Sequence, residues 1–246
     1  MLPLRTRAVL LLTLVVMSAC ASAEDRLNQG VELQSQGRYV EAVYRYAEAI
    51  EKDSEILEAR ERMVAAGDSA VMLAMDEADD LERQGDPVAA AEHYQSIDQM
   101  LARIRQVGER LALPSDYSDI RRALFDAAID WRMLEGDRAV SDGRWEDAVA
   151  LYRGARGSFL PSRSQVDASY YAETRVLLDW AGVELEDARP RASYDLAQRA
   201  LEVRDSPTRE TVLSVRDVQE AALEAGTIVV AVVPVTADAG VRDWLR

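Results

Sequence analysis

Apolar, small and polar positions recur along the chain at the spacing of amphipathic helices, in stretches that Gly and Pro separate. Apolar residues make up 48% of the sequence and aromatic residues 6%, as in a helical chain with a continuous core. The pattern predicts an all-α fold. We expect helices at about residues 25–36, 39–52, 55–84 (with a candidate bend at 67–69), 87–107, 115–141, 145–156, 164–187, 190–203 and 207–226.

A spacing of small and aromatic residues repeats within this pattern. Its first copy has intervals of 7, 5, 4 and 3 residues and consists of Gly30, Gly37, Ala42, Tyr46 and Ala49. The intervals recur in Ala78, Gly85, Ala90, Tyr94 and Ile97, in Gly136, Gly143, Ala148, Tyr152 and Ala155, and in Ala181, Ala188, Ser193, Ala197 and Ala200. Equivalent places just after the turn are held by Tyr39, Pro87, Trp145 and Pro190.

Each copy has the chemistry of a helical hairpin. The first small residue lets two helices approach closely, and the residue seven positions later allows a sharp turn. The small–aromatic–small stripe then packs the second helix against its neighbours. We expect the packing residues to be Gly30, Ala42, Tyr46, Ala49, Ala78, Ala90, Tyr94, Gly136, Ala148, Tyr152 and Ala155. Such hairpins bury their apolar faces by stacking into a solenoid.

These residues resemble the tetratricopeptide repeat, most clearly over 27–53 and 131–156. The family period is about 34 residues, whereas the turn positions here are 48, 58 and 45 residues apart. The chain therefore needs long helices or extra turns between its units, so the resemblance implies a solenoid of long-helix hairpins over residues 25–226.

The same resemblance implies a concave groove lined by the first helix of each hairpin. Tyr and Trp are favoured anchors at binding surfaces, so Trp131, Tyr170, Tyr171 and Trp180 are the candidate partner-binding residues. Packing within the solenoid is the competing role for each of them.

The amino terminus has the pattern of an export signal over residues 1–19, with Arg5 and Arg7 before a short apolar run. The ending Met-Ser-Ala-Cys resembles a bacterial lipobox, which implies acylation of Cys20, the sole cysteine. The alternative is an ordinary secretory peptide cleaved after Ala23. Because Ala21 is not Asp, the resemblance implies a lipid anchor in the outer membrane, facing the periplasm. Residues 20–24 would then be a short tether.

The formal charge is −15, from 29 basic and 44 acidic residues. Removing residues 1–19 takes away two Arg and no acid, which leaves −17. Bulk electrostatics at this charge oppose binding to nucleic acid or to an anionic membrane face. We expect a basic or neutral envelope protein as the partner.

Catalytic motifs are scarce. His93 is the sole histidine, so metal sites of the His/Cys kind are not expected. Asp79–Asp80 and 184–187 are the densest acidic groups, and residues 142–147 resemble a calcium loop but lack its terminal Glu, which favours a hairpin turn. We expect no catalytic residue, metal, cofactor or small-molecule substrate.

The function that follows is a protein-interaction scaffold or adaptor that holds a partner helix or peptide in its groove. One alternative is the lipoprotein subunit of an outer-membrane β-barrel assembly machine, which is similar in architecture alone. Another is the interaction module of an envelope enzyme or sensor whose working domain lies beyond Arg246.

Residues 227–235 form a β-branched apolar run that predicts a short strand, and Pro234 lies near the end of this run. We expect residues 227–246 to be the strand and tail that open an incomplete following domain. A strand donated to a partner's sheet and a segment lying on the final hairpin are the alternatives.

Overall fold

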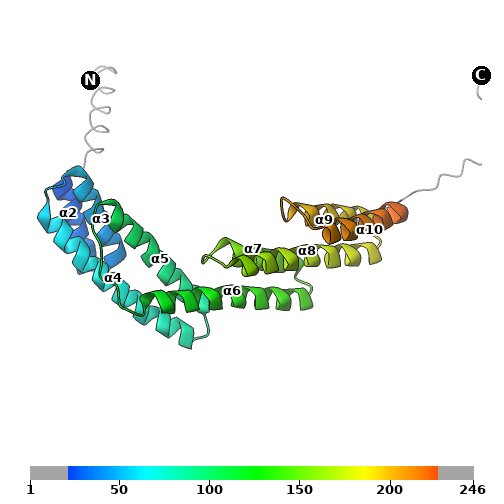
Figure 1. Ribbon diagram of the computed structural model, residues 1–246, viewed down its shortest axis with the longest axis horizontal. Coiled ribbons are helices and arrows are strands. Elements are labelled where there is room, and N and C mark those ends of the chain that lie inside the picture. Colours follow the sequence, from blue (N-terminus) through cyan, green and yellow to red (C-terminus); the bar gives the residue numbers. More distant parts are fainter. Residues whose placement is uncertain (1–21, 227–246) are drawn as a thin grey trace, which may run out of the picture. The chain divides into compact units, whose positions relative to one another are not determined.

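The computed structural model describes residues 22–226, and all of its regular structure is helical (Figure 1). The all-α prediction is confirmed for these residues, whereas the predicted strand at 227–235, the signal segment and Cys20 lie outside them. Within the described part, no helix is long and apolar enough to cross a bilayer. The helices are α2 (Ala23–Ser35), α3 (Tyr39–Lys52), α4 (Leu57–Arg83), α5 (Pro87–Gln106), α6 (Tyr117–Ser141), α7 (Trp145–Gly157), α8 (Arg163–Glu186), α9 (Pro190–Glu202) and α10 (Arg209–Gly226).

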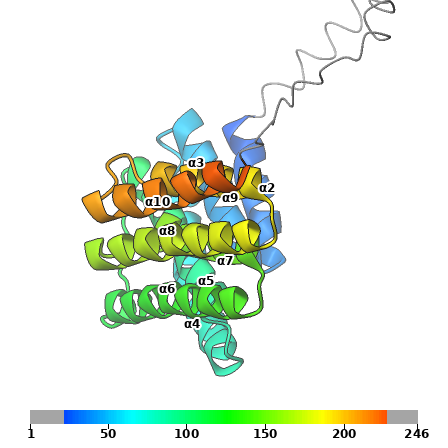
Figure 2. The ribbon, with the colours of Figure 1, turned by 90° about the vertical axis from the view of Figure 1, so that its right-hand side faces the viewer.

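The chain divides into two compact units. Unit 1 comprises the chain up to Glu135 together with Gly154–Val166, and therefore holds α2 to α5 and most of α6. Unit 2 comprises Gly136–Arg153 and the chain from Asp167, and holds α9, α10 and most of α7 and α8. Within unit 2, α8 and α10 run side by side (Figure 2).

The four hairpin turns share one hydrogen-bond pattern. In the first, the amide of Arg38 donates to the carbonyl of Leu33 (3.0 Å) and the amide of Gly37 to that of Gln34 (3.1 Å), which is the Schellman motif. The same pair of bonds closes the turns at Gly85, Gly143 and Ala188. The residue at each turn is left-handed, with φ of 75°, 79°, 71° and 58° in chain order. The second helices then begin at Tyr39, Pro87, Trp145 and Pro190, as their equivalent places in the sequence predict.

Ala188 is the turn residue that lacks the freedom of glycine. A left-handed alanine costs about 1–2 kcal/mol, which glycine would relieve. Part of that gain is lost, because glycine also makes the unfolded chain more flexible and so raises its entropy. We expect Ala188→Gly to raise the free energy of unfolding by about 0.5–1 kcal/mol, measured by urea denaturation followed by circular dichroism. The matched variant Gly37→Ala should lower it by a similar amount. A loss of stability in Ala188→Gly would contradict this account of the turn.

Long first helices account for much of the wide spacing of the turns, and the 20-residue α5 and the connection after it add to the widest one. α4, α6 and α8 have 27, 25 and 24 residues, against 13 for α2. The candidate bend at 67–69 does not interrupt α4, which is helical throughout. Gly67 instead allows a close approach: a Cβ there would lie 2.6 Å from Leu111 Cδ1.

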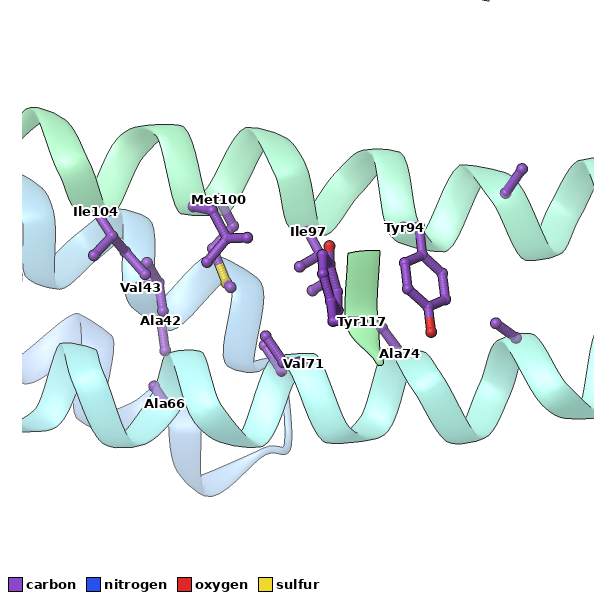
Figure 3. Packing of buried hydrophobic residues seen from close by; sticks show 14 of the residues in the cluster. Ala42, Val43, Ala66, Val71, Ala74, Tyr94, Ile97, Met100, Ile104 and Tyr117 are labelled. Carbon is purple, nitrogen blue, oxygen red and sulfur yellow. The ribbon is translucent and has the colours of Figure 1, made fainter. Parts of the chain in front are cut away.

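The core of unit 1 lies between α3, α4 and α5. Ile97, Met100 and Ile104 project from α5 toward α4, and Val43 enters from α3 (Figure 3). All four side chains are fully or almost fully buried. Burying a side chain of this size contributes about 1.5–3 kcal/mol relative to leaving it in water, so this layer holds the first two hairpins together.

Side-chain caps start several helices, including α2, α5, α8 and α10. Ser22 and Asp25 form a reciprocal capping box at α2. At α8 the hydroxyl of Ser162 accepts from the amide of Gln165, whose side chain accepts from the amide of Ser162. The capping serine is therefore not Ser164, the residue at which the sequence predicts that the helix starts. α8 consequently begins at Arg163.

Candidate binding groove

The predicted packing residues are all buried, and the structure brings the glycines against the tyrosines. A Cβ on Gly30 would lie 2.4 Å from the Tyr46 ring, and a Cβ on Gly136 would lie 2.5 Å from the Tyr152 ring. Both distances are shorter than real carbon contacts. Each glycine therefore makes room for a ring from the second helix of its own hairpin. The remaining members are Ala42, Ala49, Ala78, Ala90, Tyr94, Ala148 and Ala155, each at most 1% exposed.

The three stripe tyrosines differ in what their hydroxyls contact. Tyr46 donates to Gln34 Oε1 (2.6 Å) and Tyr152 to Asp137 Oδ1 (2.7 Å). The Tyr94 hydroxyl has no hydrogen-bond partner among residues 22–226. Burial raises the pKa of Tyr94 to about 12, and the charges of Asp79 and Asp116 add to the effect.

This difference predicts opposite effects of removing the hydroxyl. Near neutral pH, we expect Tyr94→Phe to raise the free energy of unfolding by about 1 kcal/mol, because it removes a buried polar group that lacks a partner. Tyr152→Phe should lower it by about 1 kcal/mol, because the bond to Asp137 is lost. Thermal and urea unfolding of the two variants measure both values. Equal effects in the two variants would contradict the assignment.

The raised pKa also predicts an alkaline loss of stability. The unfolded tyrosine ionises near pH 10, whereas folded Tyr94 stays neutral to about pH 12. The unfolded state therefore loses its proton first. Ionisation of this tyrosine leaves the free energy of unfolding unchanged below about pH 10 and lowers it as the pH rises from about 10 to about 12. Tyr94→Phe should flatten the pH dependence in that window.

An open groove lies in unit 2 between α8 and α10, at the end of α9, with a volume of about 380 Å³. The lining positions on α8 are 167, 170–171, 174–175 and 178–179. They recur every three or four residues, so they share one helix face. The lining residues include Tyr170, Tyr171, Thr174 and Leu178 on α8, with Glu210 and Ser214 on α10. Pockets of this size accept a few side chains of a ligand.

Two ion pairs occupy the groove walls. Arg204 Nη2 lies 3.0 Å from Asp167 Oδ1, and its guanidinium lies 5.4 Å from the centre of the Tyr170 ring. Arg175 Nε lies 3.6 Å from Asp179 Oδ2. Both lining arginines therefore already have a carboxylate partner from within the groove.

Glu210 and Tyr171 remain exposed at the groove. Glu210 lies in the first turn of α10 and makes no ion pair with any residue of the described part. Tyr171 is 66% exposed, which is unusual for a large aromatic side chain. The groove thus presents one aromatic surface and one carboxylate to a ligand.

The four aromatic candidates are not brought together. Tyr170 and Tyr171 line the groove. Trp180 is further along α8, where its Nε1 donates to Glu184 Oε1 (3.0 Å) and Arg199 covers its ring at 5.6 Å. Trp131 is in the part of α6 that belongs to unit 1 and is half-buried. Trp180 therefore lies against Glu184 and Arg199 and does not line the groove.

A smaller hollow of about 160 Å³ lies in unit 1 and includes His93. His93 Nδ1 is 3.1 Å from Glu77 Oε2. Ser96 also lines this hollow, but no hydrogen bond joins it to His93 within residues 22–226. A serine nucleophile needs that bond to its base. In the same range, no three His, Cys, Asp or Glu side chains are grouped to hold a metal ion.

Comparisons with known proteins add little. No protein-family model and no curated protein matches the chain. Among solved structures, the chain is similar to the crystal structure of a de novo designed helical repeat protein, with 16% sequence identity and a TM-score of 0.30. The match covers 83% of this chain and 96% of the designed one. The interpretation of the groove therefore depends on its own residues.

Proposed function

We propose that the protein is a tetratricopeptide-like scaffold or adaptor of the bacterial cell envelope, which holds a helix or peptide of a partner protein in the groove of unit 2. The groove between α8 and α10 is the observation that carries this proposal. α8 is the first helix of its hairpin, and α10, which follows the completed hairpin α8–α9, occupies the next first-helix position. In the tetratricopeptide family, first helices line the ligand groove.

The groove chemistry supports binding more than catalysis. Its charged side chains are mostly paired with one another, and none of the lining residues within 22–226 is histidine or cysteine. Exposed tyrosine supplies contact area at a small entropic cost, which favours recognition of a side chain.

Photo-crosslinking in intact cells tests the groove. We expect a benzophenone amino acid in place of Tyr171 to give a specific adduct with a partner protein. The same amino acid in place of Val183 is the matched control, because Val183 is exposed on α8 and does not line the groove. Equal labelling from both positions, or none from position 171, would refute the groove as the binding site.

We further propose that an acyl anchor on Cys20 holds the protein on the periplasmic face of the outer membrane. The lipobox-like ending of the signal segment supports this location, and Ala21 supports the outer membrane. Cys20→Ala should move the mature protein from the membrane fraction to the soluble fraction. A processed Cys20→Ala protein that stays in the membrane fraction would refute the anchor without bearing on the groove.

A further inference from the structure

We infer that the groove of unit 2 selects a partner segment in which a large apolar side chain is adjacent to Lys or Arg, with Glu210 as the residue that sets this preference. The inference depends on the proposed function and names the chemistry of the partner. It requires a carboxylate at the groove without an ion-pair partner, an apolar surface in the same groove, and a negative overall charge that attracts a cationic segment.

The carboxylate is Glu210. The groove contains three acidic side chains and two arginines. Asp167 and Asp179 are each paired with one of those arginines, which leaves Glu210 as the unpaired charge among the described lining residues. A bound cation next to Glu210 would therefore gain an ion pair without breaking an existing one.

The apolar surface is on α8. Tyr171 is largely exposed, and Leu178 lines the groove two turns further along the same helix. Aromatic and aliphatic side chains of a partner gain most by covering such a surface, because its water is released. The apolar side chain of the partner would then lie on Tyr171 and Leu178, and its Lys or Arg would pair with Glu210.

The overall charge favours the same partner. The formal charge of −15 attracts cationic segments over distances near the Debye length, about 8 Å at physiological salt, and repels anionic ones. Glu210 converts this general attraction into a positional preference, because it lies at the groove. Glu220 lies on the same helix but outside the groove, and Arg216 pairs with it at 3.6 Å.

A pair of defined peptides tests the inference. The probes are acetylated and amidated Gly-Ser-Trp-Lys-Ser-Gly and its counterpart with Glu in place of Lys. Binding is measured on the detergent-solubilised full chain by fluorine NMR of 3-fluorotyrosine introduced at position 171. We expect the Lys peptide to bind about fivefold more tightly at low salt, the factor that one exposed ion pair supplies, and the preference to vanish at about 1 M salt.

Glu210→Lys should reverse the preference, and Glu220→Lys, which changes the net charge by the same amount, should leave it near fivefold. The inference is overturned if neither peptide shifts the fluorine signal, if both bind equally, or if the two variants behave alike. A specific cellular adduct at position 171 combined with equal peptide binding would keep the proposed function and reject this partner chemistry. Loss of the adduct would reject the groove itself.

Discussion

Gly136→Ala is expected to lower the free energy of unfolding by about 2 kcal/mol, although alanine is intrinsically the better helix former by about 1 kcal/mol. The added Cβ would lie 2.5 Å from Tyr152 Cε1 and 2.8 Å from Cζ. The ring is 1% exposed and its hydroxyl is bonded to Asp137, so it has little room to move. Overpacking of this kind typically costs about 1–3 kcal/mol and more than offsets the helical gain.

The matched control is Gly182→Ala, also in a helix of unit 2. A Cβ at Gly182 meets no described atom within 4 Å, so the substitution should raise stability by about 0.5–1 kcal/mol. Gly30→Ala should repeat the loss in unit 1, because it meets the Tyr46 ring at 2.4 Å. Urea denaturation of the three variants measures whether each substitution raises or lowers the free energy of unfolding. A stabilised Gly136→Ala protein would show that the tyrosine ring moves aside without cost.

Arg153→Met is the second substitution with a large expected effect. Glu173 on α8 is fully buried, and Arg153 Nε on α7 donates to its Oε1 at 2.7 Å. Removing one partner of a buried ion pair typically costs about 3–5 kcal/mol, because the remaining charge is left in the interior. Arg153 is itself 56% exposed, so water screens part of the pair, and we expect a loss of about 2 kcal/mol.

A double substitution separates the pair from the packing. Arg153→Met with Glu173→Met should recover part of the lost stability, because two apolar side chains replace the pair and the buried carboxylate is removed. Arg216→Met removes an exposed pair with Glu220 and should change stability by less than about 0.5 kcal/mol. The explanation fails if Arg153→Met costs no more than Arg216→Met.

Local signals in the sequence predict the hairpins well. The left-handed turn and the helix start after it involve residues within five positions of each other, so Gly85 and Pro87 are enough to place the turn before α5. The start of α8 is harder to predict, because Ser162 and Ser164 lie two positions apart and either one can cap a helix. The fold of the described residues could therefore be predicted to within a few residues of each boundary.

The groove could be predicted only in part. Tyr170 and Tyr171 are recognisable as aromatic residues on a first helix, but Glu210 joins them through the packing of α10 beside α8. Periodicity does not say which faces of two helices meet. Trp180 shows the same limit, since Arg199, which covers its ring, lies 19 positions later in the chain. The one sequence signal that α10 packs beside α8 is its position directly after the complete hairpin α8–α9.

The shared turn geometry also bears on how the chain folds. Each Schellman turn closes with bonds that span three and five residues, so a hairpin can start forming before distant segments meet. Chains dominated by such short-range contacts have low contact order and fold in microseconds to milliseconds. The four turns at Gly37, Gly85, Gly143 and Ala188 thus provide four separate nucleation points. If a substitution slows the formation of one turn, folding can still begin at any of the other three.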